Sequence, residues 1–465
     1  MKTNNNKIGI FDAQYRALTI GIILAVTTVA FEGLGVTTIA PKVAQSLNAI
    51  HSYGWIFSAF LLSQIIGTMV IGQQIDKNGV YKSFIISILI FVGGIVIAAT
   101  SFNMYILIGG RAFQGFGAGA LLTCVYSSIT LNYPDGLRTK ILAAFSSAYI
   151  LPALIGPYIA GLLAEYQSWR FVFWLVLPFI ILSVFLTLPS FRKLQTENTI
   201  APSAKRGEYK EIYAIVLTLG TGLLLEGLGL IPDWKGIVIS VAGVLIMVQP
   251  LRKLLPEGAL LVKKGLPATI VTRGLFVACY FAVESYVVLA LTNVKGLSAD
   301  VAGLIVATGA ISWSIAAWLQ SKFDERDQGN GRIQRVMVGV ALMIVGVALV
   351  ITAMGLSGNG IVLAVFSQIL TGFGIGLAHP TTGAIALQHA KASEAGTISA
   401  NVQFVDAFSP ALSIGLGGAL ITISGTFGWG ILTGIMLALS IQLLFVLFSF
   451  IVSFRIAKKD RRLQI

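Results

Sequence analysis

Residues 111–119 read RAFQGFGAG, and residues 368–376 read QILTGFGIG. The two stretches share the pattern Gly-Phe-Gly-x-Gly at an offset of 257 residues. Each lies inside a long apolar run, where closely spaced small residues let membrane helices approach one another. The pair therefore predicts a membrane protein made of two copies of one helical unit, with a functional site at the interface between the copies.

Two further pairs of similar sequences support this duplication. The tripeptide PAL at residues 152–154 recurs at residues 410–412, an offset of 258. The sequence AFEG at residues 30–33 corresponds to AVES at residues 282–285, so each copy carries a glutamate at a similar depth of its first span. Three matches at nearly one spacing indicate a duplicated six-helix unit.

The composition agrees with a membrane protein. The chain has 465 residues, of which 56% are hydrophobic and only 11% are charged, against about 25% charged in an ordinary soluble domain. These values exclude a soluble globular protein and a disordered chain. The net charge of +13 does not indicate nucleic acid, because no basic stretch is interleaved with aromatic residues. We expect the lipid bilayer to be the partner, and we expect no cofactor and no metal.

Apolar runs of about 20 residues, the length that crosses a bilayer, predict an all-α integral membrane protein. The runs give six spans, then two, then six, which we place at about 17–40, 53–74, 83–101, 105–131, 140–164, 169–190, 212–231, 236–251, 268–292, 300–320, 333–354, 360–388, 395–423 and 427–454. We expect an N-terminal six-helix bundle (1–190), a linker with two extra spans (191–265) and a C-terminal six-helix bundle (266–465). Twelve spans, without the central pair, is the alternative. The first run is expected to be a retained span rather than a cleaved signal peptide.

Basic residues fix the orientation, because Lys and Arg concentrate in cytoplasmic loops. With the N-terminus inside, 26 of the 32 Lys and Arg residues fall on inside segments and four fall outside. The remaining two, Arg111 and Arg273, lie within or at the edge of spans. We therefore expect both termini in the cytoplasm. The compact chain, without transit or glycosylated extensions, leads us to expect a plasma membrane and a bacterial source.

The loop after the second span reads GQQIDKNGVYK at residues 72–82. Gly72 would allow close helix contact, and Asp76 could cap a helix or pair with a basic residue such as Lys77. Gly79 would supply a positive φ, which glycine adopts without a steric penalty. These residues predict a tight cytoplasmic turn.

This loop and the stretch from Arg111 through Gln114 resemble the major facilitator superfamily. Its signature loop, Gly-x-x-x-Asp-Arg/Lys-x-Gly, and its helix-4 motif, Arg-x-x-Gln-Gly-x-Gly, are both matched. The six-two-six plan is similar to the fourteen-helix drug/proton antiporter subfamily. The resemblance implies the major facilitator fold of two pseudo-symmetric six-helix bundles with two extra central helices. Two departures are that Val80 and Tyr81 replace the usual basic pair, and that the second-half copy at residues 320–324 lacks its glycine.

Gly156, Pro157 and Gly161 are similar to the Gly-Pro-x-x-Gly/Ala-Gly motif that marks antiporters in this superfamily. In physical terms, these residues weaken a helix so that it can pack closely and flex at the interface between the halves. Because symporters tend to lack the motif, the resemblance favours export.

Ionisable groups inside spans are costly and are functional by default. Glu32 and Glu284 are either carboxyl groups satisfied by nearby hydroxyls or carriers of a proton or cation. Arg111 is expected to pair with a carboxylate or backbone carbonyls, although the resemblance implicates it in proton transfer. Asp406 has no counterpart in the first half, and it either takes part in coupling or caps a helix break before a proline. Glu226, in the central pair, is expected to be structural or interfacial.

Polar side chains within the spans are candidates for the substrate cavity: Gln64, Gln114, Gln368, His379 and Gln403, together with Asn401. A lone histidine on an apolar helix is more often simply hydrogen-bonded than titrating. Trp55, Tyr149, Trp313 and Trp318 are equally compatible with an aromatic belt at the membrane interface.

The sequence favours a proton-coupled exporter of small amphipathic or drug-like compounds that works by alternating access as a monomer. The alternative is a transporter of one metabolite or lipid on the same fold, working as an importer or an exporter. The chain contains no Gly-Lys dipeptide and hence no nucleotide-binding Walker A loop. It contains no HExxH or GxSxG motif either, so we expect neither an enzyme nor an ATP-driven pump.

Overall fold

Long helices make up nearly all of the described chain. The computed structural model describes residues 9–134, 137, 141, 144, 148, 150–197, 210–356, 360–389 and 395–456. The helices are α1 (Arg16–Ser46), α2 (Trp55–Ala99), α3 (Met104–Asn132), α5 (Ile150–Tyr166), α6 (Arg170–Glu197), α7 (Lys210–Gly229), α8 (Trp234–Leu254), α9 (Leu266–Asn293), α10 (Ala299–Asp327), α11 (Arg332–Gly355), α12 (Gly360–Gln388), α13 (Ala395–Thr426) and α14 (Gly430–Ser453).

The helices confirm the membrane-spanning plan. Twelve stretches are long and apolar enough to cross a bilayer, and two of them, Ile50–Ile75 and Lys77–Ala99, fall within or next to α2. The helix α3 and the shorter α5 complete the fourteen expected from the sequence. Both members of the central pair, α7 and α8, are among the twelve, which argues against the alternative that leaves them out.

The long element α2 is a hairpin that turns at Gly79. A side chain at Gly115 of α3 would collide with Phe60, and one at Gly117 would collide with Phe91. In a straight helix Phe60 and Phe91 would lie about 45 Å apart, yet both pack against adjacent turns of α3. Gly79 has φ 80° and ψ 163°, a conformation open to glycine, so the turn lies where the sequence predicted it.

The two copies of Gly-Phe-Gly-x-Gly perform the same packing task in the two halves. A Cβ at Gly115 would lie 1.9 Å from the Phe60 carbonyl oxygen on α2, and a Cβ at Gly372 of α12 would lie 2.1 Å from the Gly309 oxygen on α10. Helix backbones therefore touch at both sites. The duplicated sequence thus gives a duplicated helix contact, one in the half formed by α1–α6 and one in the half formed by α9–α14.

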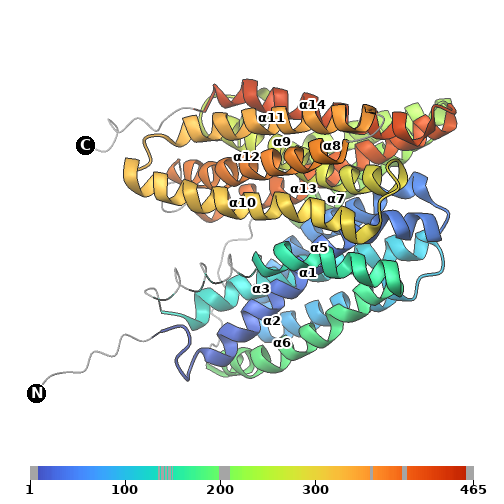
Figure 1. Ribbon diagram of the computed structural model, residues 1–465. Helices are drawn as coiled ribbons and strands as arrows, with labels where there is room; N and C mark the ends of the chain where they lie inside the picture. The colour runs from blue at the N-terminus through green and yellow to red at the C-terminus, as the bar shows by residue number, and fades with distance from the viewer. Residues whose placement is uncertain are drawn as a thin grey trace, which may run out of the picture.

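The two halves lie against each other with both chain ends on the same side (Figure 1). Their helices come together at the end opposite the termini, which we call the sealed end. At this end Tyr53 Oη donates to the Ser285 carbonyl at 2.7 Å, and Gln45 Nε2 donates to Asn293 Oδ1 at 2.9 Å. In the described part of the chain, three further hydrogen bonds join the halves directly, through the side chains of Ser58, Thr422 and Glu165. All of these bonds lie at the sealed end or toward the middle of the helices.

Helices α5 and α10 form the closest contact across the sealed end. A Cβ at Gly161 would lie 2.5 Å from Asp300 Cα, and one at Gly303 would lie 2.6 Å from the Pro157 oxygen. Backbone atoms cannot move aside as a side chain can. Two glycines, one on each helix, therefore set how closely the halves approach.

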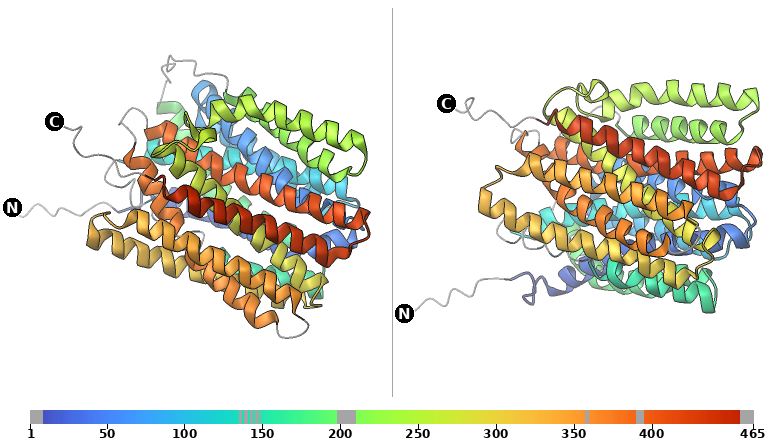
Figure 2. Two further views of the ribbon diagram at one scale, coloured as in Figure 1. Left: turned by 90° about the horizontal axis from the view of Figure 1, so that it is seen from above. Right: turned by 45° about the horizontal axis from the view of Figure 1, so that its top comes forward.

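The inserted pair α7–α8 packs on the outside of this assembly (Figure 2). Its two helices meet through glycines, since a Cβ at Gly227 would lie 2.6 Å from the Gly236 oxygen. Helix α7 also contacts both halves. Leu225 fills the space beside Gly415 of α13, and Thr218 Oγ1 donates to the Leu62 carbonyl of α2 at 3.4 Å.

We expect the substitution Gly161→Ala to open the sealed end. The added methyl group would force α5 from α10 at a cost on the order of 1–3 kcal/mol. Disulfide formation between Gln45→Cys and Asn293→Cys, both at the sealed end, measures the closed population, and the native Cys124 and Cys279 are buried. The yield should fall several-fold. Gly156→Ala is the control, because its Cβ would meet only the Phe31 ring, at 3.4 Å; equal yields in the two variants would contradict the packing argument.

Candidate functional site

A cluster of three ionisable side chains joins three helices of the second half. Arg273 of α9 donates through Nε to Asp406 Oδ1 and through Nη2 to Asp406 Oδ2, both at 2.7 Å. This two-bond arrangement is the strong, directional form of an arginine–carboxylate pair. Asp406 comes from α13, so the pair links two helices that lie 133 residues apart in the chain.

His379 of α12 is the third member of the cluster. Its Nε2 lies 2.6 Å from Arg273 Nη2 and 3.4 Å from Asp406 Oδ2. Because a guanidinium group can only donate, Nε2 accepts this hydrogen bond in the tautomer that carries its proton on Nδ1. Arg273 Nη1 also donates to Thr382 Oγ1 at 3.0 Å and to the His379 carbonyl at 2.5 Å.

The cluster is buried on one side and open on the other. The exposed fraction of the Arg273 side chain is 5%, whereas it is 29% for both Asp406 and His379. The arginine therefore lies beneath the carboxylate and the imidazole. A charged ligand or a proton could reach Asp406 without first displacing a helix.

Aromatic rings extend the cluster along α9 and α10. Trp313 lies with its ring centroid 5.5 Å from His379, 5.1 Å from Tyr280 and 6.2 Å from Phe281, all in edge-to-face arrangements. Such rings present faces that attract organic cations. The carboxylate, the imidazole and the aromatic wall together form the candidate site.

The first half holds a second ion pair, which is fully buried. Arg111 of α3 pairs through Nη1 with Glu32 Oε1 of α1, and their exposed fractions are 2% and 0%. Arg111 also donates to Gln114 Oε1 at 2.9 Å and to the Ile56 carbonyl at 3.0 Å, and it lies 4.3 Å from the Phe60 ring. Within the described residues, Glu32 Oε2 and Gln114 Nε2 have no partner, so the network has unused polar capacity.

Glu284, the counterpart of Glu32 in the second half, has different surroundings. Its exposed fraction is 3%, and among the described residues its carboxylate takes part in no ion pair or hydrogen bond. Arg273 lies eleven positions earlier on α9, about 16 Å away along the helix. The duplicated glutamates are therefore one paired and one unpaired.

The other polar residues predicted for the cavity do not gather in one place. Gln114 belongs to the Arg111 network, and Gln368 is buried against Gly309 of α10. Gln64 on α2 is half-buried and Gln403 on α13 is exposed. Of the five, the structure brings only His379 to Asp406.

The signature loop corresponds to the turn of the α2 hairpin. Lys77 is exposed, and the side chain of Asp76 lies outside the described residues. The prediction of a close helix contact at Gly72 is wrong, since a Cβ there would meet nothing within 4 Å. The close contacts of α2 with α3 lie farther from the Gly79 turn, in the parts of α2 around Phe60 and Phe91.

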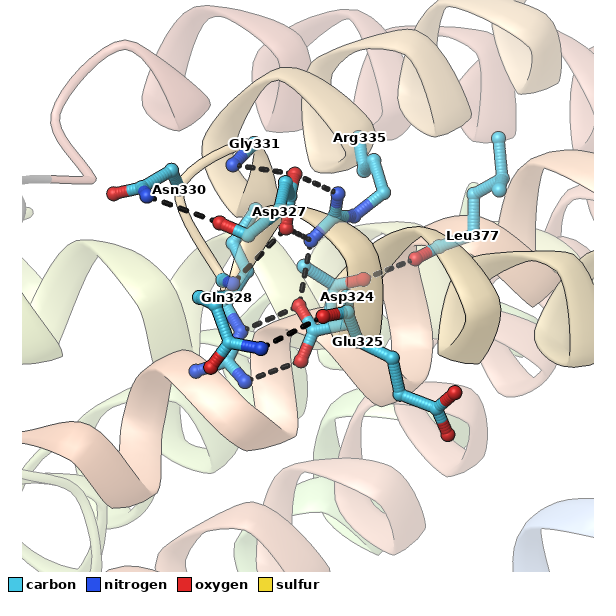
Figure 3. A network of polar contacts seen from close by, with 11 residues as sticks. Asp324, Glu325, Asp327, Gln328, Asn330, Gly331, Arg335 and Leu377 are labelled. Carbon is cyan, nitrogen blue, oxygen red and sulfur yellow. Dashed lines mark hydrogen bonds and ion pairs between the residues drawn. The ribbon is translucent and has the colours of Figure 1, made fainter.

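Ion pairs stabilise the corresponding turn of the second half (Figure 3). Asp324 accepts from Arg332 Nε at 2.8 Å and from Arg335 Nη2 at 2.5 Å, and Asp327 accepts from Arg335 Nη1 at 2.6 Å. The chain reverses at Gly329, whose φ is 80°. The glycine missing from residues 320–324 is thus replaced by one further along.

The antiporter-like motif lies at the interface between the halves. Gly161 and the Pro157 carbonyl touch α10, as described above, and Gly156 faces the Phe31 ring of α1. These contacts match the close packing that the motif predicted.

Sequence reasoning missed Arg273 and Trp313 as site residues. Arg273 was placed at the edge of a span and Trp313 in a possible aromatic belt, whereas the structure places both beside His379. One signal was available for the arginine. A carboxylate such as Asp406 inside a span requires a partner, and Arg273 is the basic residue of the second half that lies closest to a span interior.

Comparisons with known proteins agree with this architecture. A family model described as Major Facilitator Superfamily matches residues 20–414. The multidrug transporter protein MdtP of Bacillus subtilis (strain 168) is 24% identical over 440 residues, which are 92% of this chain and 76% of the relative. Multidrug efflux pump SdrM of Staphylococcus aureus (strain N315) is 23% identical over 63% of this chain and 66% of its own length. MFS-type transporter opaD of Aspergillus ustus is 32% identical, over only 35% of this chain and 28% of its own length.

Solved structures show the same fold at low identity. A POT family transporter in complex with 5-aminolevulinic acid matches with a TM-score of 0.68 and 13% identity, over 97% of this chain and 98% of that one. The nucleoside transporter NupG matches with a TM-score of 0.63 and 14% identity, over 94% and 99% of the two chains. The family match over most of the chain, on a fold of two six-helix halves, shows that this protein is a multi-pass membrane transporter of the Major Facilitator Superfamily and not an enzyme.

Proposed function

We propose that this transporter exports small amphipathic cations in exchange for protons, across a bacterial plasma membrane and with both termini in the cytoplasm. One observation carries the proposal: Asp406 is a partly exposed carboxylate inside the protein, held by Arg273 beside an aromatic wall. The names of several relatives as multidrug efflux pumps or transporters support export. The Gly156-Pro157 motif favours the same direction.

The aromatic wall provides the affinity for substrate. Trp313 and Phe281 are half-buried, so each offers ring surface to a flat organic cation, a contact worth about 0.5–2 kcal/mol for each cation–ring pair. Asp406 supplies the opposite charge. Because apolar contact tolerates many shapes, such a site would accept a class of compounds rather than one compound.

Proton exchange follows from the charge balance of the cluster. When a proton binds to Asp406, the carboxyl loses its charge and at most one oxygen remains a good acceptor for Arg273. The guanidinium keeps its bonds to the His379 carbonyl and Thr382, and its charge then faces the site without a counter-ion. An organic cation is repelled by that charge, so proton entry and cation release would occur together.

Glu284 is the second group that we assign to coupling. An unpaired carboxylate is costly to bury, and a proton on Glu284 would remove that cost. Glu284 lies on α9, which also carries Arg273. A shift of α9 caused by a proton on either group would therefore move the other group. Glu32 is assigned a supporting part, because its side chain is fully buried against Arg111, whereas that of Asp406 is partly exposed.

Alternating access would use the sealed end. In the state described here the halves are joined at the end opposite the termini, which corresponds to an inward-facing transporter if the termini are cytoplasmic. Rocking the halves would break those hydrogen bonds and form new contacts near the termini.

We expect ethidium export to require a proton gradient. Proteoliposomes loaded with ethidium, with an acidic exterior relative to the termini-facing side, should lose dye several-fold faster than vesicles without a gradient. Glu284→Gln should reduce the accelerated rate toward the rate without a gradient. Equal efflux with and without the gradient would refute proton coupling.

We expect Asp406→Asn to abolish the pH dependence of export and to slow export at least tenfold. The amide keeps the shape but cannot accept two charge-assisted bonds from Arg273, and it cannot exchange a proton. Rates measured at several values of pH check this, with Asp406→Glu as the conservative control that should restore a pH-dependent profile. A pH profile unchanged in Asp406→Asn would remove this carboxylate from coupling.

We expect Glu32→Gln to destabilise the protein more than it alters pH dependence. Removing one partner leaves Arg111 charged and buried, which costs about 3–5 kcal/mol. The double variant Glu32→Gln with Arg111→Gln removes both charges and should recover much of the thermal stability in detergent. If the double variant is no more stable than Glu32→Gln, the unpaired charge of Arg111 is not the cause of the lost thermal stability.

A further inference from the structure

A cavity lies at the sealed end, outside the cluster around Asp406. Its volume is about 390 Å³, within the range of about 300–1,000 Å³ that small-molecule sites occupy. Its walls come from α2, α3, α7 and α13, and the side chains that matter are His51, Trp55, Tyr105 and Glu226. We call it the seam pocket, because both halves and the inserted pair contribute to it.

The floor of the seam pocket is the contact between the halves. A Cβ at Gly54 would lie 2.9 Å from the Ile414 oxygen and 3.2 Å from Gly418 Cα, and Gly54 and Gly418 both line the pocket. Thr422 Oγ1 donates to the His51 carbonyl at 2.8 Å across the same contact. If the halves separated here, the floor would divide and the pocket would be lost.

Glycines hollow the pocket, and α7 closes its side. Gly229, at the end of α7, lines the pocket, and a Cβ there would meet nothing within 4 Å. Leu225 of the same helix packs into the place that a side chain at Gly415 would occupy. The inserted pair therefore supplies a wall that a twelve-helix chain would not have at this position.

The chemistry of the lining favours a cation. Glu226 is exposed, and within the described residues its carboxylate forms no ion pair or hydrogen bond. Trp55 is half-buried and Tyr105 has an exposed fraction of 83%, so two aromatic rings border the same space as the carboxylate. A carboxylate beside aromatic rings attracts organic cations and repels anions.

We propose that the seam pocket is a second binding site, which takes amphipathic organic cations and, when filled, holds the halves together at the sealed end. A ligand that binds one conformation better than another shifts the population toward it, and this pocket exists only while its floor is intact. A cation reaching it from the outside would therefore slow the transport cycle. The binding itself does not depend on proton coupling or on Asp406.

Equilibrium dialysis of ethidium against the purified full-length protein in lipid nanodiscs tests the site. The wild type should bind about two ethidium molecules per chain. Gly229→Leu adds a side chain to the pocket lining at a position where a Cβ meets nothing within 4 Å, and it should leave one. Glu226→Gln should weaken the second site about tenfold, a factor equivalent to 1.4 kcal/mol. Matched controls are Gly93→Leu, where a Cβ also meets nothing within 4 Å, and Glu257→Gln, an exposed carboxylate at the other end; both should bind two.

Transport measurements test the conformational effect. Ethidium added outside the loaded vesicles should slow export by the wild type. It should slow export by Gly229→Leu less, when the rate of each protein is compared with its own rate without external ethidium. Wild-type stoichiometry and affinity in both Gly229→Leu and Glu226→Gln would overturn the site. Loss of pocket binding without relief of the inhibition would overturn the conformational effect.

The site and the proposed function can fail separately. Asp406→Asn should keep the binding that Gly229→Leu removes, because Asp406 does not line the seam pocket. If efflux proves independent of the proton gradient while Gly229→Leu still lowers the stoichiometry by one, the seam pocket stands without the coupling mechanism. If Gly229→Leu leaves the stoichiometry unchanged, the pocket fails whatever the coupling experiment shows.

Discussion

Two arginines inside the spans determine how both halves of this transporter are arranged. A guanidinium group keeps its charge in hydrocarbon, so each arginine must meet a carboxylate and have its remaining donors satisfied. Arg111 ties α3 to α1 through Glu32, and Arg273 ties α9 to α13 through Asp406. Each half is therefore organised around one ion pair that joins helices distant in the chain.

The two pairs are not equivalent, although the halves are duplicates. The pair in the first half is fully buried, with the Phe60 ring and the Ile56 carbonyl against Arg111. The pair in the second half lies at a surface, with a histidine and a tryptophan beside it. The duplicated scaffold therefore carries unequal ionisable groups, with a fully buried ion pair in the first half and a partly exposed ion pair in the second.

Much of the fold could be predicted from local patterns. Apolar runs gave the spans, and Gly79 gave the hairpin turn, because both depend on residues close together in the sequence. The site was harder to predict because its members meet only after folding. Arg273 and Asp406 lie on different helices, and Trp313 reads the same in the sequence whether it faces lipid or His379. Gly72 shows the converse error, since a glycine in a motif need not touch a neighbouring helix.

The inserted hairpin has a consequence for the geometry of transport. Gln73 of α2 and Glu211 of α7 are joined by a hydrogen bond near the termini. In the described residues α7 and α8 meet the second half through apolar packing, in a buried cluster that includes Leu217 and Phe408. Because the hydrogen bonds of α7 join it to α2 and its packing against the second half is apolar, α7 and α8 would move with the first half during transport. The two halves of the twelve-helix core would then rock while α7 and α8 cover one side of it. The surface that the protein presents to lipid would therefore change on one side only during each cycle.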